Sequence, residues 1–518
     1  MRHQTDPVDR DPFIDALRVT SVLVVVFGHW LTTTVIWEDG LIDIENALSV
    51  VRGSHVVTWL IQVMPLLFFV GGFANARSLE AHGGDYLAFL RTRYVRLLTP
   101  TLVFVAVWLG LGLLEGLLGL DRPNPLDRAA DQAALPFWFL GLYVIVVALA
   151  PPMLALHRRH EWRVLVSMVA GVVAVDVLHH GLGVPHIGVL NYAFVWLLAH
   201  QLGYFYADGR LQNVGRRATL AIAAAGLAGL VVLTTAVGYP VSMVGVPGDD
   251  RWNTNPPSLA LVMLTVWLVG LALWLRSTPP SPGSWLISRI ERGNRVVLTV
   301  FLWHVTAISL TAAIIYPLGS PRFETGTWQW WALRPVWMVV LVPAMLGLVV
   351  GFRRFEVHPK PARLCLSGLS TTRRLVAGLG VVSLALGILG FGVTGFNRIT
   401  ETLGEEVLGF EMNPLQNVLH LALGIIALVS VPRTPGLVRA AATLIVGVYA
   451  LIGLAGSSSG IRLLGANPAS SVLHLVVGAV AGVLLCWATL VDYRIDRRAT
   501  AAEPLSIEDS RDRGLEAE

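Results

Sequence analysis

The sequence predicts an all-α polytopic membrane protein with about ten transmembrane helices followed by a second bundle of about four. Two properties of the 518-residue chain lead to this fold class: 54% of its residues are hydrophobic and only 14% are charged. A soluble globule has no interior large enough for so much apolar surface. The apolar residues are also grouped into runs of about 17 to 25 residues, the length that crosses a bilayer as a helix.

About fourteen such runs follow one another along the chain, and each predicts a membrane span. Their approximate first residues are 14, 56, 100, 136, 164, 188, 217, 258, 296, 332, 374, 415, 437 and 471. Arginine-rich connections, such as RTRYVR (91–96), alternate with acidic or neutral ones, such as VPGDDRWNTNPPS (246–258). The positive-inside rule places the arginine-rich connections and both termini in the cytoplasm. The abundance of Arg, Ala, Gly and Val indicates a bacterial plasma membrane.

Other classes of protein are excluded by charge and cysteine usage. The net charge of +4 comes almost wholly from arginine, because Lys360 is the only lysine. The arginines lie in short connections and form no patch large enough for a nucleic acid. Cys365 and Cys486 are far apart, which supports neither a disulfide framework nor a zinc site. The histidines of HHGLGVPH (179–186) fit no standard metal spacing, so we expect no bound metal.

A basic segment containing two prolines divides the chain after the tenth span. We predict four parts: a membrane domain over 1–355, a basic cytoplasmic linker over 356–373, a four-helix membrane module over 374–492 and a polar tail over 493–518, which we expect to be disordered.

The four-helix module contains an internal repeat. NPLQNVLHLALG (413–424) recurs 54 residues later as NPASSVLHLVVG (467–478). Each copy begins with an Asn-Pro pair suited to a helix start, and the glycine that ends each copy allows another helix to approach closely. His420 and His474 lie nearly two turns into these helices. Two interpretations remain open: a hydrogen bond between the histidines across a helix interface, or a ligand or proton site.

The first span, FIDALRVTSVLVVVFGHW (13–30), carries two side chains that are costly in a membrane, Arg18 and His29. Eleven residues make about three helical turns, so both leave the same face, about 16 Å apart along the axis. Such residues are retained where they face a partner or an internal cavity. The pattern predicts a cavity with a cation near one end and an imidazole in mid-membrane.

Three further features belong with this pair. PLLFFVGGFANARS (65–78) ends the second span with Gly71 and Gly72, which allow a close approach of a helix or a ligand. The connection that follows contains Arg91, Arg93 and Arg96. His304, in LTVFLWHV, lies at a depth in its span comparable to that of His29.

These residue types limit the chemistry. No span contains a lysine, neither cysteine is near these motifs, and no nucleophile elbow or phosphate-binding glycine loop is present. Histidine can instead take a proton from a hydroxyl whose oxygen attacks an activated carbonyl. The arginines of the 91–96 connection suit the phosphates of a donor, although such arginines are also ordinary topology anchors.

Several motifs in order resemble the acyltransferase family 3 of integral membrane acyltransferases over residues 10–355. They are the Arg18–His29 spacing, the FFVGGF turn, the R-x-x-R-L-x-x-P of Arg93 to Pro100, PFWFLGLY (136–143) and FLWH (301–304). Residues from about 370 to 492 resemble a small bacterial membrane domain of unknown function.

This resemblance implies transfer of an acyl group, in the first instance acetyl, from cytoplasmic acyl-CoA to a hydroxyl of a cell-surface, lipid-linked or secreted acceptor. It implies His29 as general base, Arg18 as a donor-positioning cation and His304 as an assisting residue. Two sets of binding residues follow from the same motifs. We expect Arg91, Arg93 and Arg96 to bind the acyl-CoA, and Gly71, Gly72, Trp138 and Tyr143 to bind substrate.

Two departures from the family pattern matter. Relatives often carry Ser-Gly-Phe where this chain has Gly71, Gly72 and Phe73, so a hydroxyl is missing. Many relatives also append a soluble transferase domain, whereas here a membrane module follows. Two alternatives remain: a transporter or exporter of an acylated metabolite or lipid intermediate, and a purely partner-binding role for the module. The acceptor, the acyl chain length and the oligomeric state stay open.

Overall fold

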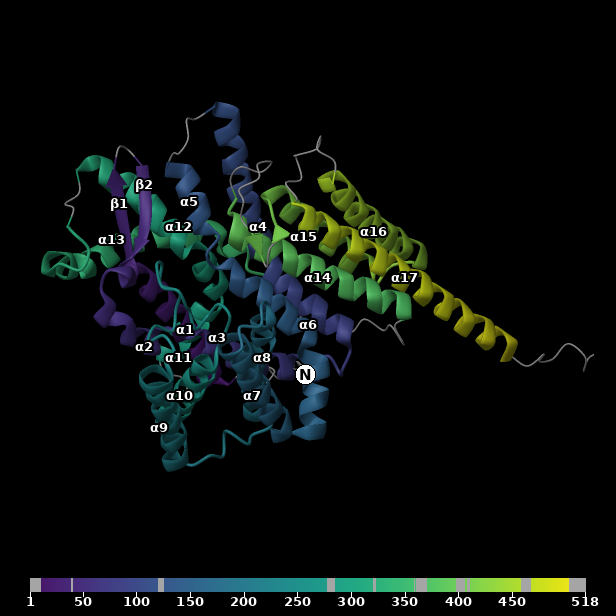
Figure 1. The fold of residues 1–518 in the computed structure, drawn as a ribbon, viewed down its shortest axis with the longest axis horizontal. Helices are drawn as coiled ribbons and strands as arrows, with labels where there is room; N and C mark the ends of the chain where they lie inside the picture. The colour runs from purple at the N-terminus through teal and green to yellow at the C-terminus, as the bar shows by residue number, and fades with distance from the viewer. Residues whose placement is uncertain are drawn as a thin grey trace, which may run out of the picture. The chain divides into compact units, whose positions relative to one another are not determined.

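The computed structural model describes residues 11–38, 41–119, 125–276, 285–319, 323–357, 359, 370–396, 406–407, 410–457 and 467–502. These residues are mostly helical, with little strand (Figure 1), which confirms the all-α fold class. They divide into two compact units: Met1–Leu364 with Thr394–Ile399, and Cys365–Val393 with Thr400–Glu518. Eleven described helical segments are long and apolar enough to cross a membrane, so the chain is a multi-pass membrane protein.

The first unit consists of membrane-length helices joined by short helical segments. Its longer helices are α1 (Pro12–Thr32), α3 (Met64–Ala81), α4 (Tyr86–Leu118), α6 (Phe137–His160), α7 (Trp162–Asp176), α8 (Leu190–Ala207), α9 (Arg216–Val232), α10 (Leu259–Leu275), α12 (Val297–Ile315) and α13 (Trp328–Phe352). The shorter ones are α2 (Thr58–Ile61), α5 (Pro125–Ala133) and α11 (Trp285–Asn294). Each predicted span of this unit begins within or beside one of these helices.

Helix α1 begins where the sequence places a strong start signal. Asp11 precedes Pro12, and its carboxylate accepts hydrogen bonds from the backbone N–H groups of Phe13 at 2.9 Å and Ile14 at 3.4 Å. An aspartate at the N-cap followed by a proline satisfies donors that would otherwise lack partners in the first turn. The same carboxylate accepts a bond from the Tyr206 hydroxyl of α8 at 2.7 Å, which joins the start of α1 to α8.

The arginine-rich segment 91–96 is not a loop, which corrects the prediction for the third span. Helix α4 begins at Tyr86, after the N-cap Asp85, and continues through Pro100 to Leu118. Arginine is a good helix former, and a proline inside a membrane helix is tolerated where neighbouring helices support it. The third span therefore begins about four turns earlier than the apolar run alone indicates.

The paired glycines also lie inside a helix rather than at a turn. Gly71 and Gly72 are in the middle of α3, the most deeply buried of the candidate spans. A Cβ atom on Gly72 would collide with the backbone carbonyl oxygen of His200, and one on Gly203 would collide with α3. Glycine is required here because the backbones of α3 and α8 touch.

A second difference is a β-hairpin in the acidic connection after α1. Strands β1 (Thr33–Glu38) and β2 (Leu41–Asn46) pair antiparallel, with Thr33 opposite Asn46. The Arg334 guanidinium of α13 donates to the Thr33 carbonyl at 2.7 Å and lies 3.6 Å from the centre of the Trp330 ring. This connection is therefore ordered, although its composition predicts only a loop.

The second unit is a bundle of four helices, visible in Figure 1 as roughly parallel rods. They are α14 (Thr371–Thr394), α15 (Pro414–Ser430), α16 (Pro435–Ser457) and α17 (Pro468–Ala502), with a short pair of strands, β3 (Glu406–Val407) and β4 (Phe410–Glu411), before α15. The asparagines that open the repeat act as N-caps: Asn413 accepts from the N–H of Gln416 at 2.8 Å, and Asn467 from that of Ser470 at 2.7 Å.

The repeat is also visible in how the helices pack. A Cβ on Gly387 of α14 would touch Leu421 of α15, and a Cβ on Gly453 of α16 would touch Leu475 of α17. Leu421 and Leu475 are equivalent positions of the two copies. The unit therefore consists of two similar hairpins, α14–α15 and α16–α17. In each hairpin a glycine of the first helix lies against a leucine of the second.

The predicted tail is helical at its start, because α17 continues to Ala502. The remainder of the tail and most of the predicted 356–373 linker lie outside the described residues.

Replacing Gly72 with alanine tests the contact between α3 and α8. We expect Gly72→Ala to lower the free energy of unfolding by about 3 kcal/mol, the upper end for forcing an extra methyl group into a packed interior. Gly110→Ala, in α4, is the matched control because nothing lies within 4 Å of its added Cβ. Thermal unfolding of the purified proteins in detergent measures both. Equal stability of Gly72→Ala and the original protein would contradict this description.

Candidate functional site

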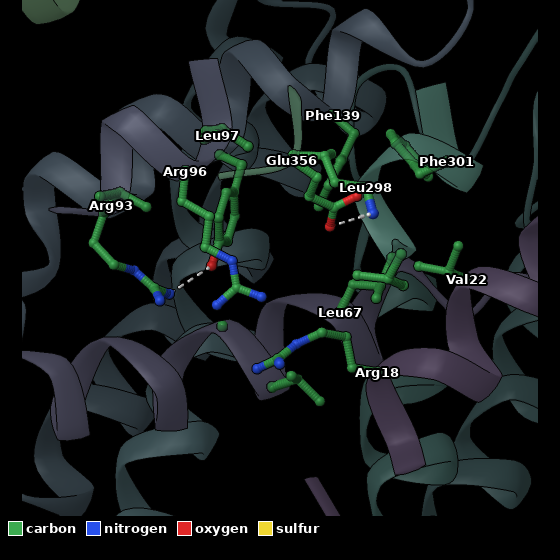
Figure 2. A pocket seen from close by; sticks show the side chains of 15 residues that line it. Arg18, Val22, Leu67, Arg93, Arg96, Leu97, Phe139, Leu298, Phe301 and Glu356 are labelled. Atoms are coloured by element: carbon green, nitrogen blue, oxygen red, sulfur yellow. Dashed lines mark hydrogen bonds between the residues drawn. The ribbon is translucent and has the colours of Figure 1, made fainter. Parts of the chain in front are cut away.

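A cavity of about 130 Å³ lies among the helices of the first unit (Figure 2). Its wall combines three arginines, one glutamate and one tyrosine with a larger number of apolar side chains. The charged and polar members are Arg18, Arg93, Arg96, Glu356 and Tyr143. They come from α1, α4, α6 and the residue that follows the 3₁₀ turn Arg353–Phe355 after α13. Residues distant in the sequence therefore meet at one cation-rich cavity.

Helix α4 explains why two of the three predicted binding arginines reach the cavity. Arg93 and Arg96 are three residues apart, so they leave the same face of the helix. Figure 2 shows both side chains turned into the cavity, with the Arg93 guanidinium donating to the Tyr143 hydroxyl at 3.4 Å. Arg91 lies on another face; it is exposed and is not among the residues that line the cavity.

Arg18 enters from α1 and is held in place by polar neighbours. Its guanidinium donates to the side-chain oxygen of Asn294 at 3.0 Å and to the Asp15 carboxylate at 3.3 Å. Asn294, the last residue of α11, donates in turn to Asp15 at 2.7 Å. This triad orients Arg18 and links the short helix α11 to the cavity wall.

Glu356 supplies the cavity with a carboxylate that none of the sequence motifs indicates. Glu356 is 6% exposed, and its carboxylate accepts three bonds from the first turn of α12: the N–H of Leu298 at 3.1 Å, the N–H of Thr299 at 2.9 Å and the Thr299 hydroxyl at 2.7 Å. Burial raises the pKa of Glu356, while the bonds from Thr299 and Leu298 and the charge of Arg96 oppose that rise. The sequence indicates this role only weakly, because Glu356 is a single acidic residue within the basic stretch RRFEVHPKPAR (353–363).

The predicted substrate-binding residues divide into two groups. Gly71 and Tyr143 line the cavity and touch each other, since a Cβ on Gly71 would lie 2.9 Å from the Tyr143 hydroxyl oxygen. The tyrosine hydroxyl therefore occupies the space beside Gly71. Gly72 instead packs against α8, and Trp138 packs against Trp196 with 5.9 Å between ring centres. Neither Gly72 nor Trp138 is among the residues that line the cavity.

His29 and His304 come together, as their similar depths indicate. Their rings lie 5.0 Å apart and almost perpendicular. The Trp30 indole donates to the His304 carbonyl at 3.1 Å, which fixes α1 against α12 at this level. Among the described residues, neither histidine lines the cavity. His304 is one turn beyond the cavity residue Phe301 on α12, and His29 is two turns beyond the cavity residue Val22 on α1.

The protonation of His304 follows from its bonds. Its Nδ1 lies 2.6 Å from the Phe301 carbonyl oxygen, which can only accept, so Nδ1 carries the hydrogen. In the neutral ring, Nε2 then carries a lone pair. Nε2 is buried and has no hydrogen-bond partner among the described atoms. His304 therefore keeps a buried nitrogen lone pair about one helical turn beyond the cavity residue Phe301.

The histidines of HHGLGVPH (179–186) are not among the residues that line the cavity. His179 and His180 lie in the π-helical turn Val177–Gly181 after α7, with 4.6 Å between their rings. Within the ranges that the structure describes, no three or more His, Cys, Asp or Glu side chains are grouped so that they could hold a metal ion.

Comparison with protein families gives two matches. A model described as an acyltransferase domain matches residues 11–354, which include all the cavity residues except Glu356. A second model, described as a domain of unknown function (DUF4383), matches residues 373–487. These are the two families that the sequence resembles. The comparisons with curated proteins and with solved structures give no match.

Glu356 gives a prediction for stability against pH. Because burial raises its pKa in the folded protein, the folded state takes up a proton more readily than the unfolded state. Its stabilising contribution is therefore complete below the ordinary pKa of glutamate and is lost as the pH rises through the raised value. The unfolding free energy of the original protein relative to Glu356→Gln should increase as the pH falls through this window.

Chemical unfolding at a series of pH values measures this difference. Glu324→Gln is the matched control because Glu324 is exposed. We expect that change to stay within about 0.5 kcal/mol throughout, as is usual for surface substitutions. A pH-independent difference for Glu356→Gln would show that Glu356 has the same pKa in the folded and unfolded states.

Proposed function

Because the chain belongs to the acyltransferase family whose model covers residues 11–354, we propose that this membrane acyltransferase is an acyl-CoA-dependent O-acyltransferase. It moves an acyl group, in the first instance acetyl, to a hydroxyl of a cell-surface, lipid-linked or secreted acceptor. The observation that carries the proposal is the meeting of three guanidinium groups in one cavity, with a histidine pair further along α1 and α12, two helices that also line this cavity.

The cation-rich cavity suits the phosphate-bearing part of the donor. Planar guanidinium groups bind phosphates with paired, charge-assisted hydrogen bonds, and these bonds strengthen where water is excluded. Arg93 and Arg96 are presented by a rigid helix, and Arg18 is oriented by Asn294 and Asp15. Asp15 compensates the charge of Arg18, and Glu356 adds a carboxylate to the cavity that Arg93 and Arg96 line. In the proposal these arginines hold the phosphates, while Arg91, which is exposed, stays outside the binding site.

In the proposal the thioester of the donor reaches the histidine pair. His29 is about 16 Å from Arg18 along α1, so an extended chain anchored at the arginines runs toward it. In the proposed step His29 takes the proton of the acceptor hydroxyl while that oxygen bonds to the acyl carbon. The carbon–sulfur bond breaks, and the proton passes to the departing thiolate. His304 assists on the acceptor side, since its Nδ1–H is committed to Phe301 and its Nε2 carries the lone pair.

The topology that accompanies this function is part of the proposal. With both termini in the cytoplasm of a bacterium, the arginines of α4 lie near the cytoplasmic surface, where acyl-CoA is made, and the β1–β2 hairpin lies on the opposite surface. The arginine-rich connections HRRHEWR (157–163) and GRLQNVGRR (209–217) then share the cytoplasmic side.

Removing the proposed base tests the reaction. We expect His29→Ala to lower acyl transfer by about 10²–10⁴-fold, the usual contribution of a general base, and to leave coenzyme A binding unchanged. The measurement is release of free thiol from acetyl-CoA by purified protein supplied with a membrane extract as acceptor. His160→Ala, at the end of α6, is the control. Transfer at the original rate by His29→Ala would reject the role of His29.

The arginines give a second prediction. Losing one charge-assisted bond costs about 1.5–3 kcal/mol, so Arg93→Gln and Arg96→Gln should each weaken coenzyme A binding by about 10- to 100-fold. Arg91→Gln is the matched control on the same helix and should bind as the original protein does. Calorimetric titration with coenzyme A measures all three. Equal effects of the three changes would indicate a general charge effect and no defined phosphate site.

The acceptor can be identified by mass spectrometry. Surface glycans and lipids from a strain lacking the protein should lose the mass of one acyl group, which identifies the donor and the acceptor together.

A further inference from the structure

The second unit contains a buried polar cluster to which each of its four helices contributes one side chain. Ser383 comes from α14, His420 from α15, Tyr449 from α16 and His474 from α17. All four are at most 7% exposed. The Ser383 and Tyr449 hydroxyl oxygens are 3.2 Å apart, and the Tyr449 oxygen is 3.1 Å from Nδ1 of His420. The Nε2 atoms of His420 and His474 are 3.5 Å apart.

The two imidazole rings meet head to head. Their centres are 5.6 Å apart and their planes differ by 25°. Because the Nε2 atoms are much closer together than the ring centres, the rings do not overlap face to face; each directs Nε2 at the other. Two nitrogen lone pairs repel at this distance, so one of the two Nε2 atoms carries a hydrogen.

The surrounding bonds decide which nitrogen carries it. Nδ1 of His474 lies 2.7 Å from the Ser470 carbonyl oxygen, which can only accept, so the hydrogen of neutral His474 is on Nδ1. His420 must then donate from Nε2 and accept at Nδ1. Tyr449 donates to His420, and Ser383 donates to Tyr449. Every hydrogen of the chain is thereby assigned, and all the bonds point from Ser383 toward His474.

From this arrangement we propose that the second unit contains a proton-transfer site, formed by the hydrogen-bonded chain Ser383–Tyr449–His420–His474. Ionisable side chains inside membrane helices are costly and are typical of proton pathways. A bond between helices alone needs one donor and one acceptor. Here both nitrogens of both rings are engaged in sequence, so each ring can receive a proton on one nitrogen and release one from the other.

The transfer step is balanced. The proton on Nε2 of His420 moves to Nε2 of His474 as His420 takes the phenolic proton of Tyr449 at Nδ1. Tyr449 takes the hydroxyl proton of Ser383, and a water molecule returns a proton to Ser383. His474 releases its Nδ1 proton to water. At each station one bond to hydrogen breaks and one forms, and one proton enters the chain for each proton that leaves. The 3.5 Å separation is long for a hydrogen bond, so transfer also requires a small approach of the two rings.

A proton suits this site better than a metal ion. The described residues of the unit supply no third His, Cys, Asp or Glu ligand, and a metal ion between two neutral rings would add an uncompensated charge to the helix interior. Tyr449 is the titratable group in contact with the pair. Of the described charged groups, Glu411 on β4 precedes α15 at the end of the bundle nearer the histidines. The others lie toward the opposite end: Arg373 and Arg374, Arg433 and Arg439, and Asp492 and Arg494.

Nitrogen-15 NMR of the histidine-labelled, full-length protein in phosphatidylethanolamine–phosphatidylglycerol vesicles tests the proposal. We expect Nδ1–H on His474, Nε2–H on His420 and a coupling between their Nε2 atoms. Tyr449→Phe removes the proton donor to His420 and should slow exchange of the histidine protons with deuterated water by about 100-fold, at the lower end for a proton-relay group. Tyr493→Phe, an exposed position on α17, is the matched control.

The opposite results overturn the proposal. Unchanged exchange in Tyr449→Phe would leave the cluster as a link between helices only. Stoichiometric metal in the purified protein, with Nδ1–H on both histidines, would make it a metal site. Ser383→Ala removes only a hydroxyl and serves as the second variant where Tyr449→Phe unfolds the bundle. Slower exchange in Ser383→Ala supports the relay, and unchanged exchange rejects it. The measurement does not involve acyl transfer, so it stands apart from the function proposed for the first unit.

Discussion

The constraint on which the first unit depends is the cost of placing charge among apolar helices. Three guanidinium groups share a cavity whose remaining wall is mostly hydrocarbon. Like charges that share one cavity repel strongly where water is scarce, so they persist only beside compensating groups. Asp15 and Asn294 fix one of them, and Glu356 provides the nearby carboxylate. Because Glu356 also accepts from the first turn of α12, the same carboxylate orders the helix that carries His304.

Much of this arrangement follows from the sequence, for reasons that act locally. Apolar runs of membrane length can only become helices, because no other single segment satisfies its own backbone in lipid. The spacing of Arg18 and His29 fixes their relation along one helix, and the Asn-Pro pairs at 413 and 467 start helices wherever those helices pack. The histidines at 29 and 304 stand out in the sequence because an imidazole is energetically costly inside a membrane helix.

The rest depends on which helices become neighbours, which no single segment encodes. Whether Gly72 faces a ligand or a backbone depends on α8, a helix more than a hundred residues later in the chain. The sequence around Glu356 does not show that its carboxylate accepts hydrogen bonds from the first turn of α12. The charge of the 91–96 segment indicates a loop between spans, whereas a capped, arginine-rich segment extends a helix readily. In the four-helix module, the sequence likewise does not show that His420 meets His474, because this contact depends on the fold of both hairpins.

Finally, the position of Arg93 and Arg96 on α4 has an energetic consequence. A flexible basic loop loses conformational entropy each time it closes on an anion. The backbone that carries Arg93 and Arg96 is already ordered in a long helix, so most of this entropy is lost during folding. Guanidinium groups held in this way discriminate between anions by shape as well as by charge. An anion whose oxygens do not match their positions forms few hydrogen bonds with them. The arginine-bearing part of the cavity wall therefore keeps one shape and one pattern of charge, which are set by the helix and not by an occupant.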